Sequence, residues 1–393
     1  MYRQILALMD FSNVLTDTYT LILLIVLAVA FVFLMLYYGF VVMRVGLYKN
    51  KKIPKAADIS DDDLPSVSVV LTAHNETNYL KENLVYLLEQ DYPNFEVVVV
   101  DYTSSDDTQF VLRVCSENYP NLKPITFSKD VNMFSGKKYP LSIGIRSAKN
   151  DVILLTEPDC LPKSFNWIRN MMAGYTTGAD IVVGYSGVKQ EPGLLNNLIQ
   201  YDNLTATASC LGMLIMGNPY TASGHNLSYR RDFFFDHGAF INHYKEPEGA
   251  DDMFVNQNAT KQNTVMVLEP DAFVMCEPRA TYEMWKLQRK ARYSTKKYYS
   301  CKDKTLLSLP YIAVTLFYAA VVLLLVAGTF PWEIVAAIVT IKLAWQIITF
   351  SRLSKRFDVK GVTFWSPLYE LYFLLANTIL YVTTLHHKKR KWK

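Results

Sequence analysis

The feature that most constrains this sequence is a block of 26 residues without a charged side chain, from position 18 to position 43. A helix needs about 20 predominantly apolar residues to cross the hydrocarbon core of a membrane, so this block predicts a transmembrane helix. It follows a polar leader, residues 1–17, rather than the basic start and short apolar stretch of a cleavable signal peptide. We therefore interpret residues 18–43 as a retained anchor.

Three further apolar segments lie near the carboxyl end, at about 305–332, 334–350 and 368–385, and a basic tail, residues 386–393, follows them. We predict two or three membrane crossings within residues 305–385. The second of these segments contains Lys342, and a charge at the bilayer centre costs about 2.5–3.5 kcal/mol on insertion scales. This lysine therefore needs a protein partner, a path for its amine to the interface, or a shallow position.

Basic residues flank the middle of the chain on both sides. Five of them follow the first apolar block, at positions 44, 49, 51, 52 and 55, and a basic segment, residues 286–304, precedes the second. Because basic flanks stay on the cytoplasmic side, we predict a multi-pass protein of the cell membrane whose middle region is cytoplasmic. Three further crossings would leave the basic tail outside, so one of the last two segments is expected to be re-entrant or interfacial.

Composition supports a membrane protein and argues against several other classes of protein. Hydrophobic residues make up 51% of the chain and charged residues only 19%, which is too apolar for an ordinary soluble enzyme. The net charge of +4 is too small to indicate a nucleic-acid partner. The five cysteines, at positions 115, 160, 210, 276 and 301, include no Cys-x-x-Cys pair. We therefore expect reduced thiols, with neither a disulfide framework nor a zinc site.

An α/β pattern fills residues 65–285, after a linker at 44–64 that contains basic and acidic residues. Runs rich in β-branched residues predict strands at 67–72, 96–101, 151–156 and 180–185. Between the first two, Leu80, Leu84, Leu87 and Leu88 share the spacing of one helix face. Strands alternating with helices indicate a mostly parallel sheet, in which ligands bind beyond the carboxyl ends of the strands.

Acidic side chains follow three of the predicted strands. Glu76 comes after the first strand, Asp101 closes the second, and Glu157 and Asp159 follow the strand at 151–156. Two carboxylates one residue apart at such an exit can hold a hard divalent cation, which in turn binds diphosphate. Two structural roles are alternatives to ligand binding. Asp101 could form a turn or cap a helix, and the residues from Glu157 to Asp159 could form an acidic turn with Pro158 at its corner.

Six segments in order resemble the family 2 glycosyltransferases, which have the nucleotide-sugar-binding fold called GT-A. The segments are VSVVLTAHNET, VVVVDYTSSDDT, SGKKYPLSIGIRSAKNDVILLTEPD, SGHNLSYRR, GADDMF and WKLQRKARY. The resemblance covers about residues 65–300. It implies a Rossmann-like GT-A catalytic domain at 65–285, between amino- and carboxyl-terminal transmembrane helices.

The resemblance also implies roles for individual residues. The residues matching the nucleotide-sugar contacts are Ala73, Asn75, Glu76, Asp101 and Lys137. Glu157 and Asp159 occupy the positions of the Asp-x-Asp metal motif, so a divalent cation, Mn²⁺ or Mg²⁺, is expected. Asp252 matches the catalytic base. The residues matching contacts to acceptor or diphosphate are Gly224, His225, Asp251, Gln288 and Arg292.

Some positions depart from the family pattern or allow a simpler interpretation. Tyr102 replaces an acid in the base-binding motif, and Gln288 and Arg292 are one residue further apart than in the family, with Tyr293 where Trp is usual. The paired acids at 251 and 252 would also start a helix well, and a lone histidine such as His225 is often structural. The basic segment 286–304 would equally suit an interfacial helix on anionic headgroups.

The resulting hypothesis is an inverting, metal-dependent transfer of a sugar from a nucleotide-diphosphate sugar to a lipid or lipid-linked glycan at the cytoplasmic membrane face. Two alternatives are a processive polysaccharide synthase and a non-catalytic membrane scaffold that binds nucleotides. A nucleotidyltransferase is disfavoured because no Gly-rich phosphate loop accompanies the first strand.

Overall fold

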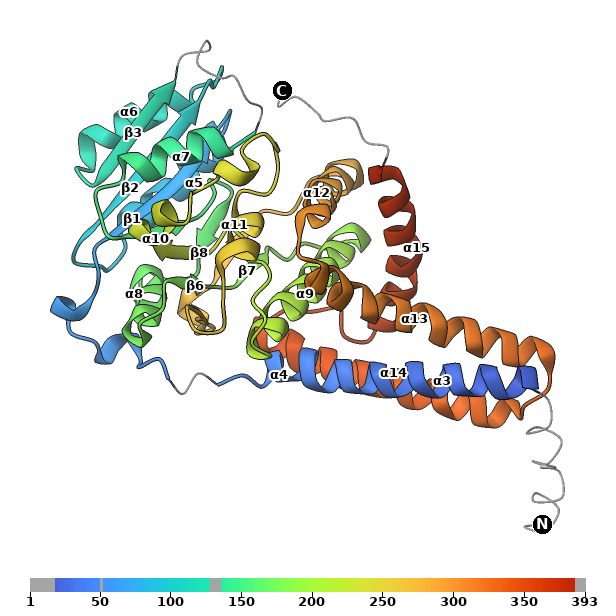
Figure 1. Cartoon of the computed structure of the whole chain (residues 1–393). Helices are drawn as coiled ribbons and strands as arrows, with labels where there is room; N and C mark the ends of the chain where they lie inside the picture. The colour runs from blue at the N-terminus through green and yellow to red at the C-terminus, as the bar shows by residue number, and fades with distance from the viewer. Residues whose placement is uncertain (1–17, 50–51, 128–135, 386–393) are drawn as a thin grey trace. The chain divides into compact units, whose positions relative to one another are not determined.

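Figure 1 shows a computed structural model of the chain, which describes residues 18–49, 52–127 and 136–385. The predicted leader, 1–17, and basic tail, 386–393, lie outside the described residues. The chain forms two compact units. One, here called the helical unit, contains the described residues up to Leu47 and Cys301–Val382; the other, the sheet unit, contains Tyr48–Ser300.

In the described part of the sheet unit, seven strands form a mixed sheet of order β3-β2-β1-β4-β8-β6-β9. Its strands are β1 (Val67–Ala73), β2 (Phe95–Tyr102), β3 (Leu122–Phe127), β4 (Val152–Leu155), β6 (Ile181–Val183), β8 (Leu227–Arg230) and β9 (Thr264–Met266). All neighbours pair in parallel except β8, which is antiparallel to both β4 and β6. The four predicted strands correspond to β1, β2, β4 and β6, so the predicted mostly parallel α/β sheet is confirmed.

Helices cover both faces of the sheet, beginning with α5 (Thr77–Leu88), α6 (Thr108–Asn118) and α7 (Lys138–Ser147). The predicted leucine face of α5 is buried in one core with alternate residues of β1 and β2, and each fully buried leucine contributes about 1.5–3 kcal/mol. The opposite face packs against α7 at Gly144, where a Cβ would come within 2.7 Å of Val70 and 2.9 Å of Val100. A glycine is therefore needed for this close helix–sheet packing.

The sheet unit also contains further helices, 3-10 turns and a second, smaller sheet. The helices are α8 (Trp167–Met172), α9 (Leu194–Ile215), α10 (Arg231–Asp236), α11 (Asp251–Asn258) and α12 (Tyr282–Thr295). The 3-10 turns are η2 (Ala56–Asp58), η3 (Asp61–Asp63), η5 (Ala173–Thr177), η6 (Ile241–His243), η7 (Pro270–Ala272) and η8 (Lys296–Tyr298). A second sheet of order β5-β10-β7 joins β5 (Cys160–Pro162), β10 (Val274–Cys276) and β7 (Ser186–Val188).

Two cysteines contradict the expectation of reduced thiols. Cys160 and Cys276 are joined by a disulfide, whereas the other three cysteines are free. The two residues are 116 positions apart, and they meet because β5 and β10 pair antiparallel with Cys276 opposite Cys160. Sequence spacing contains no information about that pairing.

The helical unit contains α3 (Thr18–Tyr37), which continues through a π-helical turn, η1 (Tyr38–Val42), into α4 (Met43–Gly46). It also contains α13 (Cys301–Ala327), α14 (Trp332–Phe357) and α15 (Ser366–Leu385). Among the described residues, three helices are long and apolar enough to cross a membrane: Thr18–Gly46, Cys301–Ala327 and Trp332–Phe357. These three run side by side in Figure 1, while α15, the predicted fourth segment, crosses them at a steep angle and is not one of the three.

Lys342 lies in the middle of α14 and is fully buried. Its amine forms an ion pair with Glu370 of α15 and donates to Gln346 Oε1 at 2.7 Å and to Tyr318 Oη at 3.1 Å. Of the three solutions open to this lysine, the structure uses a protein partner. The pair is also a specific contact between α14 and α15.

Candidate active site

The carboxyl ends of β1 and β2 bring two of the predicted nucleotide-binding residues side by side. Ala73 and Asp101 are partners in the parallel register. Asp101 is fully buried, and its Oδ1 accepts a hydrogen bond from the Ser104 amide at 3.4 Å. Its Oδ2 has no hydrogen-bond partner among the described residues. A buried carboxylate oxygen without a partner is costly, so this atom is suited to accept a hydrogen bond from a ligand.

Asn75 joins the loops that follow β1 and β2. Its φ of 59° lies in the left-handed region, which asparagine tolerates better than most residues. Its amide donates to Ser104 Oγ at 2.9 Å, and its side-chain Oδ1 accepts from the Ser105 amide at 2.8 Å. The two loops are therefore fixed to each other beside Asp101.

Three predicted acidic residues form one group, called here the carboxylate group: Glu76, Glu157 and Asp159. Burial, followed by repulsion from Asp159 and Glu157, raises the pKa of Glu76 to about 7. Burial also raises the pKa of Asp159, and Glu157 adds to that effect. Like charges in a poorly solvated place disfavour one another, so this group is suited to bind positive charge.

Two basic side chains contact the carboxylate group. Lys137 Nζ lies 2.5 Å from Glu157 Oε1 and 3.4 Å from Asp251 Oδ2. Burial opposes ionisation of Glu157, but Lys137 outweighs it and the pKa of Glu157 is lowered. Arg279 Nη1 lies 3.3 Å from Asp159 Oδ2. Arg279 was not predicted, because it lies beyond β10 and outside every motif that the sequence offered.

A small pocket beside these contacts is lined by Lys137, Glu157, Gly224 and Asp251, among others. A Cβ at Gly224 would lie 1.9 Å from Asp251 Oδ2, so only glycine permits this approach of the carboxylate. Asp251 Oδ1 has no hydrogen-bond partner in the described part of the chain. The structure thus brings Gly224 and Asp251, from separate motifs, to the carboxylate group.

Asp252 is the second residue of α11 and is held by three donors. Its Oδ1 accepts from the Met253 amide at 2.9 Å, and its Oδ2 accepts from Thr295 Oγ1 at 2.6 Å and Tyr299 Oη at 2.8 Å. Burial raises the pKa of Asp252, while the bonds from Thr295 and Tyr299 oppose that increase. The acidic pair therefore starts a helix, and its second carboxylate is also oriented.

The predicted residues of α12 have different surroundings from one another. Arg292 Nη2 lies 2.5 Å from Asp202 Oδ2, and the buried Arg289 lies 3.3 Å from Asp202 Oδ1. Gln288 is exposed and, among the residues that the structure describes, makes no hydrogen bond to the carboxylate group. The Lys296 amine lies 3.8 Å from the centre of the Tyr293 ring. Asp202 was missed because it lies inside α9, where no local pattern distinguishes it.

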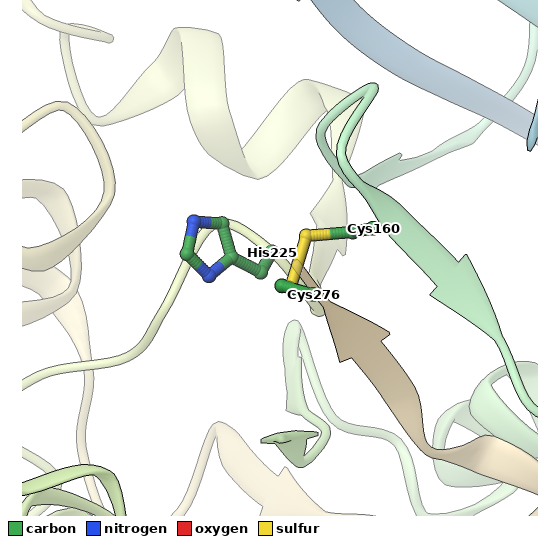
Figure 2. A group of neighbouring side chains, drawn as sticks. All are labelled: Cys160, His225 and Cys276. Atoms are coloured by element: carbon green, nitrogen blue, oxygen red, sulfur yellow. A yellow bond between two sulfur atoms is a disulfide. The ribbon is translucent and has the colours of Figure 1, made fainter. Parts of the chain in front are cut away.

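His225 is partly exposed in the loop before β8. Its ring lies near the Cys160–Cys276 disulfide, as Figure 2 shows. Its charge, when present, lowers the pKa values of Glu157 and Asp159, against the effect of burial. His225 therefore lies close to the carboxylate group, and the acceptor or diphosphate contact that the resemblance implies for it stays a prediction.

Part of the chain is similar to known proteins. Residues 68–238 match the model for glycosyl transferase family 2. This segment is therefore similar to the family 2 glycosyl transferases. The matched range includes Glu157 and Asp159, whereas Asp252, Gln288 and Arg292 lie beyond it.

Curated relatives match only part of the chain. The probable glycosyltransferase YdaM of Bacillus subtilis is 26% identical over 220 residues, which are 52% of this chain and 50% of YdaM. Glycosyltransferase AglE of Haloferax volcanii is 26% identical over 185 residues, 46% of this chain and 57% of AglE. Poly-beta-1,6-N-acetyl-D-glucosamine synthase of Staphylococcus aureus is 24% identical over 155 residues, 38% of this chain and 36% of the synthase. The chain thus spans about half the length of the first two relatives.

A solved structure extends the similarity to the fold. The mannosyltransferase PcManGT from Pyrobaculum calidifontis, in complex with GDP-Man and Mn²⁺, superposes with a TM-score of 0.56 at 20% identity. The match covers 91% of this chain and 98% of PcManGT. The GT-A fold expected for residues 65–285 is confirmed.

Proposed function

We propose that the chain transfers a sugar, with inversion, from a nucleotide-diphosphate sugar to a hydroxyl of a membrane lipid or lipid-linked glycan. One observation carries this proposal. The carboxylate group, with Lys137 and Arg279, lies at the end of the sheet where α/β proteins bind ligands, and Asp252 is held on a separate element by its own donors. A leaving-group site and a separate base are the two parts that a single displacement needs.

The donor nucleotide would bind along the ends of β1 and β2. The free Oδ2 of the buried Asp101 can accept from an N–H of the nucleobase. The linked loops at Asn75 and Ser104 keep that carboxylate at a fixed position. The diphosphate would then extend toward Lys137 and Arg279, whose positive charges oppose its negative charge.

The residues of the carboxylate group suit a divalent cation. Glu157 and Asp159 follow β4 at a spacing of two, and both are poorly solvated, so their oxygens are preorganised ligands of the kind Mn²⁺ and Mg²⁺ prefer. A bound cation would neutralise negative charge that develops on the departing diphosphate. PcManGT, whose structure was solved with GDP-Man and Mn²⁺, supports this assignment by analogy.

Asp252 would act as the base that takes the proton from the acceptor hydroxyl. Its burial raises its pKa and so its proton affinity, while Thr295 and Tyr299 orient one oxygen and leave the carboxylate able to accept. Direct displacement inverts the anomeric carbon and requires no carboxylate nucleophile, in contrast to the double displacement that retains configuration.

We place the sheet unit at the cytoplasmic face. Three crossings, by α3–α4, α13 and α14, would leave residues 48–300 and the chain after Phe357 on one side of the membrane. The basic residues after α3 and those at the end of α14 would then share that side, as the positive-inside rule requires. If α15 does not span the membrane, the basic tail also stays inside.

The experiment is a transfer assay on the full chain in detergent, with a panel of nucleotide-diphosphate sugars, Mn²⁺ or Mg²⁺, and lipid extracts as acceptors. Asp252→Asn should abolish transfer and leave donor binding, measured by thermal shift, unchanged. Asp271→Asn, at an exposed aspartate of η7, is the matched control. Full activity of Asp252→Asn would contradict the assignment, and a product that retains the donor's anomeric configuration would contradict inversion.

A processive synthase remains the second candidate, because one relative is a poly-beta-1,6-N-acetyl-D-glucosamine synthase. Product length separates the two candidates. A single added sugar per acceptor supports the non-processive reaction, while long polymer at low conversion of acceptor supports the synthase.

A further inference from the structure

Two cysteines and a histidine from three distant segments meet next to the carboxylate group. Cys160 of β5 and Cys276 of β10 face each other across an antiparallel pair, and His225 comes from the loop before β8. Figure 2 shows the imidazole beside the two sulfur atoms. The possible ligand atoms of the three residues all lie within 4.8 Å of one another.

The chemistry of this group differs from that of the proposed catalytic cation site. Thiolate sulfur and imidazole nitrogen are soft or borderline ligands that select Zn²⁺, whereas carboxylate oxygens suit Mg²⁺ and Mn²⁺. Tetrahedral zinc with bonds of about 2.0–2.3 Å needs ligand atoms roughly 3.3–3.8 Å apart. Opening the bond between the two sulfurs would let side chains that now lie within 4.8 Å of one another adopt that arrangement.

The residue next to Cys160 could supply a fourth ligand. Asp159 Oδ1 is 3.4 Å from Cys160 Sγ, so the adjacent residue supplies an oxygen at a distance typical of neighbouring ligands of one zinc ion. Cys160 and Cys276 are buried, while His225 is partly exposed. A zinc ion would therefore reach the two cysteines from the side of the molecule on which His225 is exposed.

We propose that Cys160, Cys276 and His225, with Asp159, form a Zn²⁺ site when the disulfide is reduced. Two equivalents of a small thiol reduce the disulfide to two protein thiols and leave as their own disulfide, so electrons and protons balance. Zinc binding then releases the two thiol protons. Reduction is the expected condition if the sheet unit is cytoplasmic, because that compartment keeps thiols reduced.

Binding at this site would inhibit transfer, a consequence that rests on the function proposed above. The Asp159 carboxylate cannot coordinate a zinc ion bound to Cys160 and, in the same position, a Mg²⁺ or Mn²⁺ ion bound to Glu157. Zinc would also draw Asp159 away from Arg279, which now lies 3.3 Å from it. Zinc in the reduced protein is therefore expected to lower transfer, and the oxidised protein should be insensitive.

The binding test requires no enzyme activity. The full chain in detergent is prepared oxidised, or reduced with a water-soluble phosphine, incubated with Zn²⁺ and freed of loose metal by gel filtration. Zinc per chain is then measured by mass spectrometry, and Co²⁺ is substituted to record the sulfur-to-metal absorption band. We expect roughly one zinc per chain in the reduced protein, background zinc in the oxidised protein, and a thiolate band only after reduction.

Variants provide the second comparison. Cys276→Ala and His225→Asn should lose the retained zinc, whereas Cys115→Ala, at a free cysteine of α6, should keep it. Equal zinc in the reduced and oxidised wild-type protein would overturn the proposal without depending on any variant's folding. Equal zinc in Cys276→Ala and wild type would also overturn it. A protein that binds zinc as expected but transfers no sugar would refute the proposed function alone.

Discussion

Replacing Tyr299 with phenylalanine tests whether Asp252 is the base. The Tyr299 hydroxyl donates to Asp252 Oδ2 at 2.8 Å, beside the 2.6 Å bond from Thr295. Both bonds favour the ionised carboxylate and lower its pKa against the effect of burial. Removing one donor therefore raises the pKa of Asp252 in the folded protein.

The size of the shift follows from the strength of the bond. A hydrogen bond to a charged group contributes about 1.5–3 kcal/mol, and about 1.36 kcal/mol corresponds to one pKa unit. Because Asp252 is partly solvated, the lower end applies, and we expect a shift of about 1 pH unit. The base acts when ionised, so transfer is lost as pH falls through its pKa. In Tyr299→Phe the acidic limb of kcat/KM should therefore move to higher pH.

The assay is the pH dependence of kcat/KM for wild type, Tyr299→Phe and Tyr298→Phe. Tyr298 is an exposed neighbour and serves as the matched control, with an unchanged profile. At pH well above both pKa values, Tyr299→Phe should regain most of the wild-type rate. An acidic limb that stays in place, or that moves to lower pH, would refute the role given to Asp252.

Three further changes test other parts of the structure. Asp159→Asn should weaken Mn²⁺ binding in the oxidised protein, measured by calorimetry, because one of the carboxylate ligands is neutralised; unchanged affinity would argue against this residue as a ligand. Gly224→Ala should lower stability by about 1–3 kcal/mol and reduce transfer, because the new Cβ would lie 1.9 Å from the Asp251 carboxylate; a normal melting temperature and rate would contradict the close approach. Lys342→Met should destabilise the helical unit by about 3–5 kcal/mol, because Glu370 loses its buried partner, and the double change with Glu370→Met should recover much of the loss in a detergent melt.

Local patterns predicted the elements that depend on local physics. The leucines of α5 repeat at the period of a helix. The segments of β1, β2 and β4 are short runs rich in β-branched residues, as is typical of strands buried on both faces. The carboxylates at 157 and 159 were found for a similar reason, since a strand end is a local feature.

Partners that meet only through tertiary structure were not predictable. The contact between Cys160 and Cys276 depends on the pairing of β5 with β10. The spacing of cysteines in the sequence does not predict that pairing. Arg279 follows β10 and reaches Asp159 only because that strand pairs with β5. Hydropathy could not identify Glu370 as the partner of Lys342. An acidic residue only lowers the mean hydropathy of its segment and does not indicate which residue it contacts.

The pair formed by Lys342 and Glu370 also bears on how the chain is made. The lysine is synthesised 28 residues before its partner, so α14 leaves the ribosome carrying a charge that nothing yet neutralises. A lysine at the bilayer centre adds about 2.5–3.5 kcal/mol to the free energy of inserting such a helix. Stable integration of α14 should therefore wait for α15, and a nascent chain stopped before Glu370 would present an incompletely inserted helix to the quality-control proteases of the membrane.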